Sequence, residues 1–222
     1  MSVIRSVFER PLHRLLDPVV TAAAQAGVRP NTISTAGFIG NLLAAALLFA
    51  GQFILGGILI WTAGILDMLD GRVARYTRQE SVYGAIYDAT LDRIGEIAVY
   101  TGLGSNFILH GRYLTALIVV IATAGSFLVS YVRARAESYN IPCSVGMLCK
   151  GERVFLLGIG LVLNFLGHTL DRPLRMLLTV IHLPHRFPPM PIAIVLSALA
   201  ILAPITVIQR LLYVKAAQHP GV

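Results

Sequence analysis

Long apolar segments recur along the chain, and polar residues interrupt them at short intervals. A transmembrane helix needs about 20 mostly apolar residues, because each residue adds 1.5 Å to a helix that must cross about 30 Å of hydrocarbon. The pattern therefore predicts an all-α integral membrane protein with six transmembrane helices. We expect these spans at residues 32–50, 53–75, 82–108, 113–137, 151–170 and 189–213.

The N-terminal segment has a different pattern, in which Arg10, His13 and Arg14 alternate with Val, Leu and Phe at helical spacing. This spacing is typical of an amphipathic helix that lies in the membrane surface with its apolar face down. The alternative is a disordered basic tail. We therefore predict three parts: an interfacial juxtamembrane helix over 1–28, a six-helix domain over 29–215 and a tail over 216–222.

The composition supports a membrane protein. The mean hydropathy is +0.73 and 13% of the residues are charged, whereas a soluble domain has about 25%. The net charge of +7 could indicate a nucleic-acid partner, but the basic residues are spread along an apolar chain. Basic cytoplasmic ends explain them better, so we expect no nucleic-acid partner.

The basic residues also predict an orientation. If the N-terminus is cytoplasmic, 14 of the 18 lysines and arginines lie on the cytoplasmic side. The positive-inside rule then places both termini in the cytoplasm, and we expect the protein in the cell membrane. We expect no cleavable signal, because the first 30 residues lack a compact apolar core. Cys143 and Cys149 fit no zinc spacing and are expected to be free thiols.

Four aspartates occur at the facing ends of the second and third predicted spans. Asp67 and Asp70 share one helical stripe with Gly71, Ala74 and Arg75. A second stripe on the next helix contains Gly84, Asp88 and Asp92. Residues three or four apart lie on one face of a helix, and the short connection "YTRQES" makes the two helices antiparallel neighbours. The two acidic stripes are therefore predicted to face each other.

Facing carboxylates in a membrane span need a positive partner. One charged side chain in a span costs about 2.5–3.5 kcal/mol on insertion scales, and four would also repel one another. Carboxylate oxygens are the ligands of hard divalent cations, so we predict a Mg²⁺ or Mn²⁺ site with room for two ions. The alternative is that these aspartates are ordinary helix-end charges solvated by water.

These residues carry a resemblance to a known family. The pattern D-x2-D-G-x2-A-R-x8-G-x3-D-x3-D is matched at every fixed position, and it resembles the signature of the CDP-alcohol phosphotransferase family. The resemblance implies six transmembrane helices, a homodimer and a cytoplasmic active site with two metal ions. It also implies an enzyme that transfers a substituted phosphate from a CDP-linked membrane lipid, such as CDP-diacylglycerol, to an alcohol and releases CMP.

The same resemblance assigns roles to individual residues. Asp92 would be the catalytic base that accepts the hydroxyl proton, as well as lying close to the metal ions. The metal ligands would be Asp67, Asp70 and Asp88, together with Asp92. The CDP donor would be bound by Asn31, Thr32, Gly71, Arg75 and Ser81. From the residues alone, Arg75 could instead balance the aspartates and Ser81 could cap the third helix; Asn31 or Thr32 could cap the first.

The acceptor is predicted from basic residues at the inner ends of three later spans. No acidic residue lies three or four positions away from them on a helix apart from Glu137, four residues after Arg133. Unpaired cations near a metal site favour a phosphorylated alcohol, and the pattern resembles prokaryotic phosphatidylinositol-phosphate synthases, which use inositol 1-phosphate. The lysine in "LCKGER" departs from that subgroup, which usually has arginine there. The predicted acceptor-phosphate residues are Arg133, Lys150, Arg153 and Arg210.

Several alternatives remain open from the sequence. Glycerol 3-phosphate would make the protein a phosphatidylglycerophosphate synthase, and the lipid donor could carry archaeal-type isoprenoid chains. The basic residues could also be ordinary cytoplasmic anchors. A metal-ion transporter would need acidic groups near the bilayer midplane, whereas these lie near one end of their helices. A non-catalytic scaffold is disfavoured because no acidic residue of the motif is missing.

Overall fold

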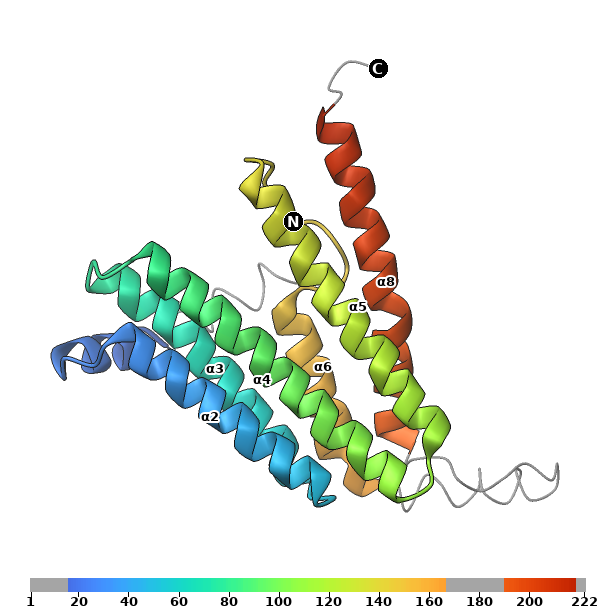
Figure 1. Ribbon diagram of the computed structural model, residues 1–222. Helices are drawn as coiled ribbons and strands as arrows, with labels where there is room; N and C mark the ends of the chain where they lie inside the picture. Colours follow the sequence, from blue (N-terminus) through green and yellow to red (C-terminus); the bar gives the residue numbers. More distant parts are fainter. Residues whose placement is uncertain (1–15, 167–189, 219–222) are drawn as a thin grey trace, which may run out of the picture.

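A computed structural model describes residues 16–166 and 190–218, and the regular structure in these ranges is helical (Figure 1). Residues 16–25 are helical. The longer helices are α2 (Pro30–Phe49), α3 (Phe53–Tyr76), α4 (Val82–Leu109), α5 (Tyr113–Ser138), α6 (Lys150–Val162) and α8 (Met190–Gln218). A short 3₁₀ helix, η1 (Leu163–Leu166), follows α6.

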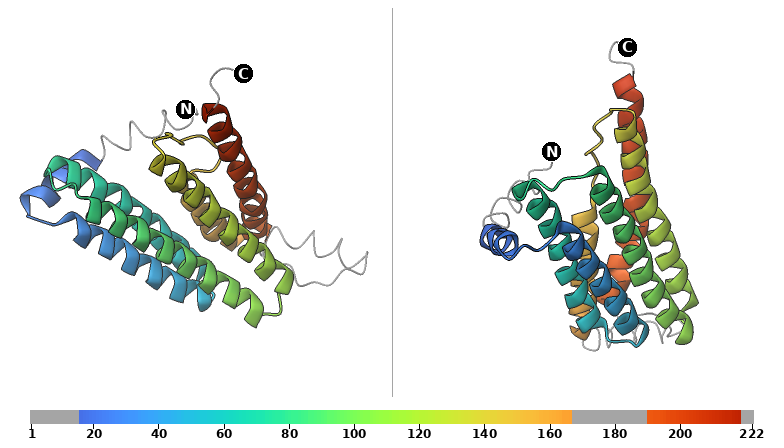
Figure 2. Two further views of the ribbon diagram at one scale, coloured as in Figure 1. Left: turned by 45° about the horizontal axis from the view of Figure 1, so that its top comes forward. Right: turned by 60° about the vertical axis from the view of Figure 1, so that its left-hand side comes forward.

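The helices form two groups that share α6. Helices α2, α3 and α4 lie side by side, while α5 packs along α8 (Figures 1 and 2). Helix α6 contacts both α3 and α8, and α4 contacts α5. The connection between α3 and α4 is short, so the acidic ends of these helices are adjacent, as predicted. The buried core that joins the groups includes Leu48, Leu103, Leu161 and Leu199.

Local sequence signals explain the helix ends near the acidic stripes. Pro30 occupies the first turn of α2, where its missing N–H is not needed. The predicted cap at Asn31 or Thr32 is wrong, because both residues lie inside α2 and the N-cap is Arg29. Ser81 does cap α4: its side chain accepts a hydrogen bond of 3.0 Å from the backbone N–H of Gly84.

A glycine lets the backbone of α4 approach that of α2 closely. A Cβ atom on Gly102 would collide with the carbonyl oxygen of Ala45 on α2. Only glycine permits this backbone approach. Such small-residue contacts are typical of helix packing in membranes, where close van der Waals contact replaces the hydrophobic drive.

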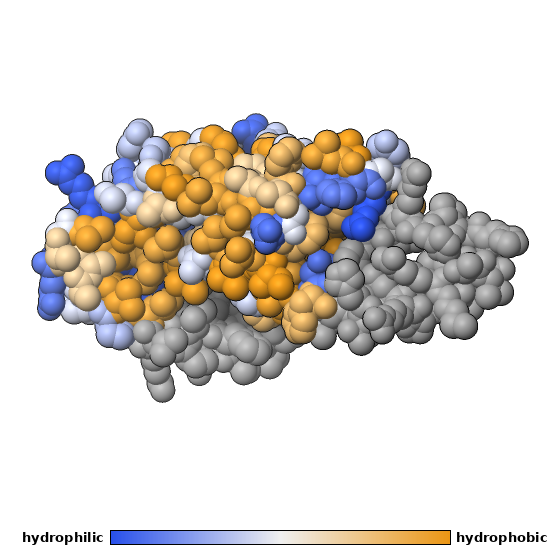
Figure 3. Space-filling model, turned by 90° about the horizontal axis from the view of Figure 1, so that it is seen from below, coloured by the Kyte–Doolittle hydropathy of each residue, from blue (hydrophilic) through white to orange (hydrophobic). Residues whose placement is uncertain are grey.

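The protein is a membrane protein by the length and composition of its helices. Among the described residues, four helices are long and apolar enough to span a bilayer: α2, α3, α5 and the 191–217 part of α8. Apolar side chains such as Leu114, Val120 and Ile201 are exposed on the outside. Apolar residues cover much of the surface in Figure 3, while hydrophilic residues gather at its left end and in a patch at the upper right. This distribution suits a lipid environment.

The count of six spans stays a prediction. Helix α4 covers the third predicted span, but it contains the charged residues Asp88, Asp92, Arg93 and Glu96 and is not among the four described helices that are long and apolar enough to span a bilayer. Helix α6 has 13 residues, which gives about 20 Å, too short to cross a bilayer by itself. The rest of the fifth predicted span lies outside the described residues.

The N-terminal prediction is only partly tested. Residues 16–25 are helical, but residues 1–15, including Arg10, His13 and Arg14, lie outside the described range. The apolar side chains of Leu16 and Val20 do not face outward, since they pack with Val73 and its neighbours on α2 and α3. Asp17 forms an ion pair with Arg72 of α3. This part of the segment is therefore attached to the helix that carries the first acidic stripe, and its contact with the membrane stays a prediction.

Candidate active site and metal centre

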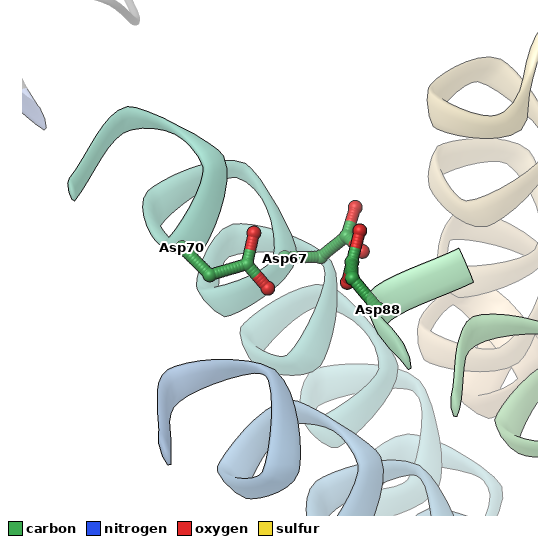
Figure 4. A group of neighbouring side chains, drawn as sticks. All are labelled: Asp67, Asp70 and Asp88. Atoms are coloured by element: carbon green, nitrogen blue, oxygen red, sulfur yellow. The ribbon is translucent and has the colours of Figure 1, made fainter. Parts of the chain in front are cut away.

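Three of the four aspartates gather between α3 and α4. Each of Asp67, Asp70 and Asp88 offers a carboxylate oxygen, and these oxygens lie within 4.8 Å of one another. Figure 4 shows the carboxylates from the two helices pointing into one shared space. Oxygen atoms bound to one Mg²⁺ at about 2.0–2.1 Å lie at most about 4.2 Å apart. Small side-chain adjustments would therefore let this donor set hold a divalent ion.

The surroundings of Asp70 favour a cation. Its side chain is buried at 4% exposure. It accepts hydrogen bonds from the hydroxyl of Ser34, at 2.6 Å, and from the N–H of Gly71. Within the described ranges no basic side chain forms an ion pair with Asp70 or Asp88. Because buried carboxylates need compensating positive charge, this cluster fits a metal ion.

Asp92 lies beside this cluster and is joined to it through a lysine. The ammonium group of Lys150, at the start of α6, forms ion pairs with both Asp67 and Asp92. The guanidinium of Arg93 lies 3.7 Å from the same Asp92 carboxylate. The structure thus separates a three-carboxylate group from a fourth carboxylate held by basic side chains. The predicted roles of Asp92, as catalytic base and as a residue close to the metal ions, stay predictions.

The basic residues predicted to bind the acceptor have very different surroundings. Arg133 is exposed and pairs with Glu137 at 2.8 Å. Arg153 is 1% exposed and contacts Glu96 and Ser130, at 3.3 and 3.2 Å. The expectation of an unpaired cation is therefore wrong for Lys150, which pairs with two aspartates, whereas Glu137 was already named as a possible partner of Arg133. Helix packing places Lys150 beside Asp67 and Arg153 beside Glu96, although these partners are far apart in the chain.

Arg210 acts as a structural clamp. It is 2% exposed, and its guanidinium donates hydrogen bonds to the carbonyl oxygens of Val145, at 2.9 Å, and Val129. One turn earlier on α8, the hydroxyl of Thr206 accepts a hydrogen bond of 3.3 Å from the N–H of Leu148. These contacts fasten the 139–149 connection to α5 and α8, and this connection leads directly into Lys150.

We expect Arg210→Ala to destabilise the protein by about 1–3 kcal/mol. The substitution leaves two buried carbonyl groups without their donor, and each such loss carries a penalty of that order. The melting temperature of the detergent-purified variant should fall clearly below that of the wild type. Lys215→Ala, which removes an exposed cation from the same helix, is the control. An unchanged melting temperature for Arg210→Ala would contradict the clamp.

Part of the predicted donor site lines an open cleft at the start of α2. Asn31, Thr32 and Ser81 contribute to this cleft of about 610 Å³, together with Arg29 and Gln79. Gly84 lies against the cleft, since a Cβ atom there would be 3.3 Å from the Asn31 side-chain oxygen. Gly71 and Arg75 do not line the cleft. They lie together on the acidic stripe of α3, where a Cβ on Gly71 would be 3.8 Å from the Arg75 guanidinium.

The structure adds polar residues that the sequence did not indicate. Ser34 supports Asp70, and the hydroxyl of Thr35 lies 3.0 Å from that of Tyr87. Glu96 joins Arg93 to Arg153. Ser34 could have been found, because it lies one turn after Asn31 on a short polar run. Glu96 follows Asp92 by four residues and could have extended the second acidic stripe.

Comparison with known families supports an enzymatic site. The family model described as CDP-alcohol phosphatidyltransferase matches residues 28–203. The chain belongs to this family. The predicted resemblance is thus confirmed, and this phosphatidyltransferase is an enzyme of phospholipid synthesis. The alternatives of a metal-ion transporter and a non-catalytic scaffold are wrong.

Named relatives of this phosphatidyltransferase come from archaea and bacteria. Archaetidylinositol phosphate synthase from Methanothermobacter thermautotrophicus is 32% identical, over 72% of this chain and 78% of the relative. Phosphatidylinositol phosphate synthase from Mycobacteroides abscessus is also 32% identical, over 68% and 70%. The enzyme of that name from Cutibacterium acnes is 30% identical over 92% of this chain and 94% of the relative.

Solved structures agree with the fold and with the kind of site. A crystal structure of Mycobacterium tuberculosis phosphatidylinositol phosphate synthase with CDP-DAG bound superposes with a TM-score of 0.73, at 26% identity, over 90% of this chain and 94% of that one. A second structure of that enzyme, in complex with manganese and citrate, gives a TM-score of 0.72 at 26% identity, over 89% and 88%. Together with the three clustered carboxylates, these similarities indicate a divalent-metal enzyme.

Proposed function

We propose that this phosphatidyltransferase is a phosphatidylinositol phosphate synthase. It transfers the phosphatidyl group of CDP-diacylglycerol to a hydroxyl group of inositol 1-phosphate and releases CMP. The acceptor oxygen forms a bond to the lipid-side phosphorus, and the bond from that phosphorus to CMP breaks. We further propose that the enzyme works in the cell membrane as a homodimer, with its active site facing the cytoplasm.

The observation that carries the proposal is the headgroup shared by the named relatives. At 30–32% identity, archaeal and bacterial relatives differ in the lipid that they are named for, but all three names contain inositol phosphate. The acceptor is therefore the best-supported part of the assignment. Two lipid donors are candidates, because the archaetidylinositol phosphate synthase and the phosphatidylinositol phosphate synthase have the same sequence identity to this chain. We favour diacylglycerol because the superposed structure contains CDP-DAG.

The residues of the site support this chemistry. Asp67, Asp70 and Asp88 would hold the divalent ions, Mg²⁺ or Mn²⁺, and Asp92 would lie close to them. When bound, these ions neutralise the donor pyrophosphate and stabilise CMP as the leaving group. Asp92 accepts the proton of the attacking hydroxyl, while Lys150 and Arg93 hold its carboxylate in place. The polar cleft of Asn31, Thr32 and Ser81 would bind the cytidine diphosphate, and Gly71 and Arg75 would flank the pyrophosphate.

The acceptor phosphate requires accessible basic groups near Asp92. Lys150 meets this need, since its side chain is 33% exposed and contacts Asp92. Arg133 is exposed near the C-terminal end of α5. We propose these two residues as phosphate contacts. Arg153 and Arg210, which are almost fully buried, instead hold Lys150 and the 139–149 connection in place.

An acceptor panel tests the proposal. Purified protein with CDP-diacylglycerol and Mg²⁺ would be offered inositol 1-phosphate, inositol, glycerol 3-phosphate, serine and glycerol in turn, and CMP release would be measured. We expect inositol 1-phosphate to be preferred over the acceptors without a phosphate by roughly 10- to 150-fold, because a charged hydrogen-bond partner contributes about 1.5–3 kcal/mol. We expect it to be preferred over glycerol 3-phosphate because the named relatives share the inositol phosphate headgroup. The same panel with a CDP-linked archaeal lipid decides between the two donors. Preference for glycerol 3-phosphate would refute the acceptor assignment.

A further inference from the structure

A small cavity with a mostly apolar wall lies between the helices next to Asp92. Its volume is about 50 Å³, and residues of α2, α3, α4 and α6 line it. The polar lining comes from Asn41, Asp67, Asp92, Glu96, Tyr100, Lys150 and Arg153. The remaining lining is largely apolar. The cavity therefore offers hydrogen-bonding groups and apolar contacts side by side, directly beside the catalytic base.

Small residues create both the cavity and the place of Asn41 in it. On α4, a Cβ atom on Gly95 would lie 2.9 Å from the Asn41 amide nitrogen. Glycine at this position, one turn after Asp92, therefore leaves the space that the Asn41 side chain occupies. On α3, a Cβ on Gly64 would lie 3.1 Å from a methyl group of Val154, so the opposite wall also depends on a missing side chain.

Asn41 differs from the other polar groups around the cavity. Lys150 pairs with Asp67 and Asp92, and Glu96 pairs with Arg153. Within the described part of the chain, Asn41 makes no hydrogen bond. By contrast Asn106, another amide on a membrane helix, donates a hydrogen bond of 2.9 Å to the carbonyl oxygen of Phe49. An amide has two donors and one acceptor to satisfy, so Asn41 presents unused hydrogen-bonding groups to the cavity.

We propose that Asn41 is a specificity-determining residue that hydrogen-bonds a hydroxyl group of the acceptor polyol. This inference rests on the proposed function, which places a hydroxyl-rich acceptor beside Asp92. A cavity of about 50 Å³ exceeds the 10–15 Å³ needed for one water but is smaller than the 150 Å³ that holds benzene. It therefore admits one edge of a polyol ring, while the ring's phosphate stays near Lys150.

The test is a cycle that combines a protein variant with altered acceptors. Asn41→Ala would be assayed with inositol 1-phosphate and with analogues that each lack one hydroxyl. We expect the variant to raise the KM for inositol 1-phosphate by roughly threefold to tenfold, the effect of one neutral hydrogen bond, with the KM for the CDP donor unchanged. One analogue should be a poorer substrate for the wild type but suffer no further loss with the variant.

Two further variants separate binding from structure. Asn106→Ala removes an amide outside the cavity, so it should lower the melting temperature and leave the discrimination between acceptors unchanged. Asn41→Ser shortens the side chain but keeps a polar group. If Asn41→Ala does not fold, the KM values for inositol 1-phosphate and its analogues are measured with Asn41→Ser instead. The inference is overturned if folded Asn41 variants keep the wild-type KM for inositol 1-phosphate. It is also overturned if, for every analogue, removing the hydroxyl raises the KM by the same factor in the variant as in the wild type.

The two proposals can fail separately. If the wild type releases no CMP with inositol 1-phosphate, the proposed function fails, and the cycle is run with the hydroxylated acceptor that the panel identifies. If the wild type uses inositol 1-phosphate and Asn41→Ala binds it normally, only the role of Asn41 is refuted.

Discussion

We expect Asp67→Asn, Asp70→Asn and Asp88→Asn each to lower CMP release at least about a hundredfold. Removing a single group that stabilises developing charge has an effect of this size in other enzymes, and these carboxylates form the one described cluster suited to a metal ion. Each change replaces a charged ligand by an amide of the same shape. The variants should therefore insert into the membrane, and they should elute as folded protein in detergent.

Metal binding gives this prediction a readout besides activity. The melting temperature of the wild type should rise with added Mn²⁺, because a ligand of the folded state stabilises it, and this rise should be reduced in each variant. Glu80→Gln, an exposed carboxylate in the α3–α4 connection, serves as the control. Normal CMP release by the wild type in excess chelator would rule out the metal centre.

The second large effect is expected at Asp92. Asp92→Asn should lower kcat by roughly 10²- to 10⁴-fold, the contribution of a positioned general base, while the KM values for donor and acceptor change little. This split distinguishes a base from a binding contact. Steady-state CMP release at varied concentrations of each substrate measures it, with Asp17→Asn as a matched substitution at an exposed carboxylate.

Asp92 also forms an ion pair with Lys150. A carboxylate that only holds this lysine would give a different kinetic result from a carboxylate that accepts the proton. In the main prediction Lys150 keeps its place through its second ion pair, with Asp67. If Asp92 is instead what positions Lys150, the substitution would raise the KM for the acceptor along with any fall in kcat. If Asp92→Asn changes the acceptor KM and leaves kcat near the wild-type value, Asp92 positions the lysine and another group accepts the proton.

The sequence was sufficient to predict the helices around the site. The helices α2 to α5 begin and end within a few residues of the predicted spans, because glycine, proline and polar residues separate long apolar runs. The acidic stripes also faced each other as predicted, since helical spacing and a short connection define both. The short α6 was not foreseen, because an apolar run does not show where a helix stops.

Long-range pairing could not be predicted. Lys150 meets Asp67 across 83 positions of the chain, and Arg210 meets Val129 across 81. Basic residues at helix ends look alike in a sequence whether they lie in water, in an ion pair or inside the protein. Only the packing of α6 and α8 shows that Arg153 and Arg210 are buried while Arg133 is exposed.

The place of Lys150 has a consequence for how the protein is made. Ribosomes synthesise the chain from its N-terminus, so α3 and α4 with their four aspartates are complete before Lys150 is added. The arginine that fixes the connection before Lys150 belongs to α8, the last described helix. During synthesis the acidic pair of helices is therefore without its lysine until α6 follows, and the connection before Lys150 is without its hydrogen bond from Arg210 until α8 follows.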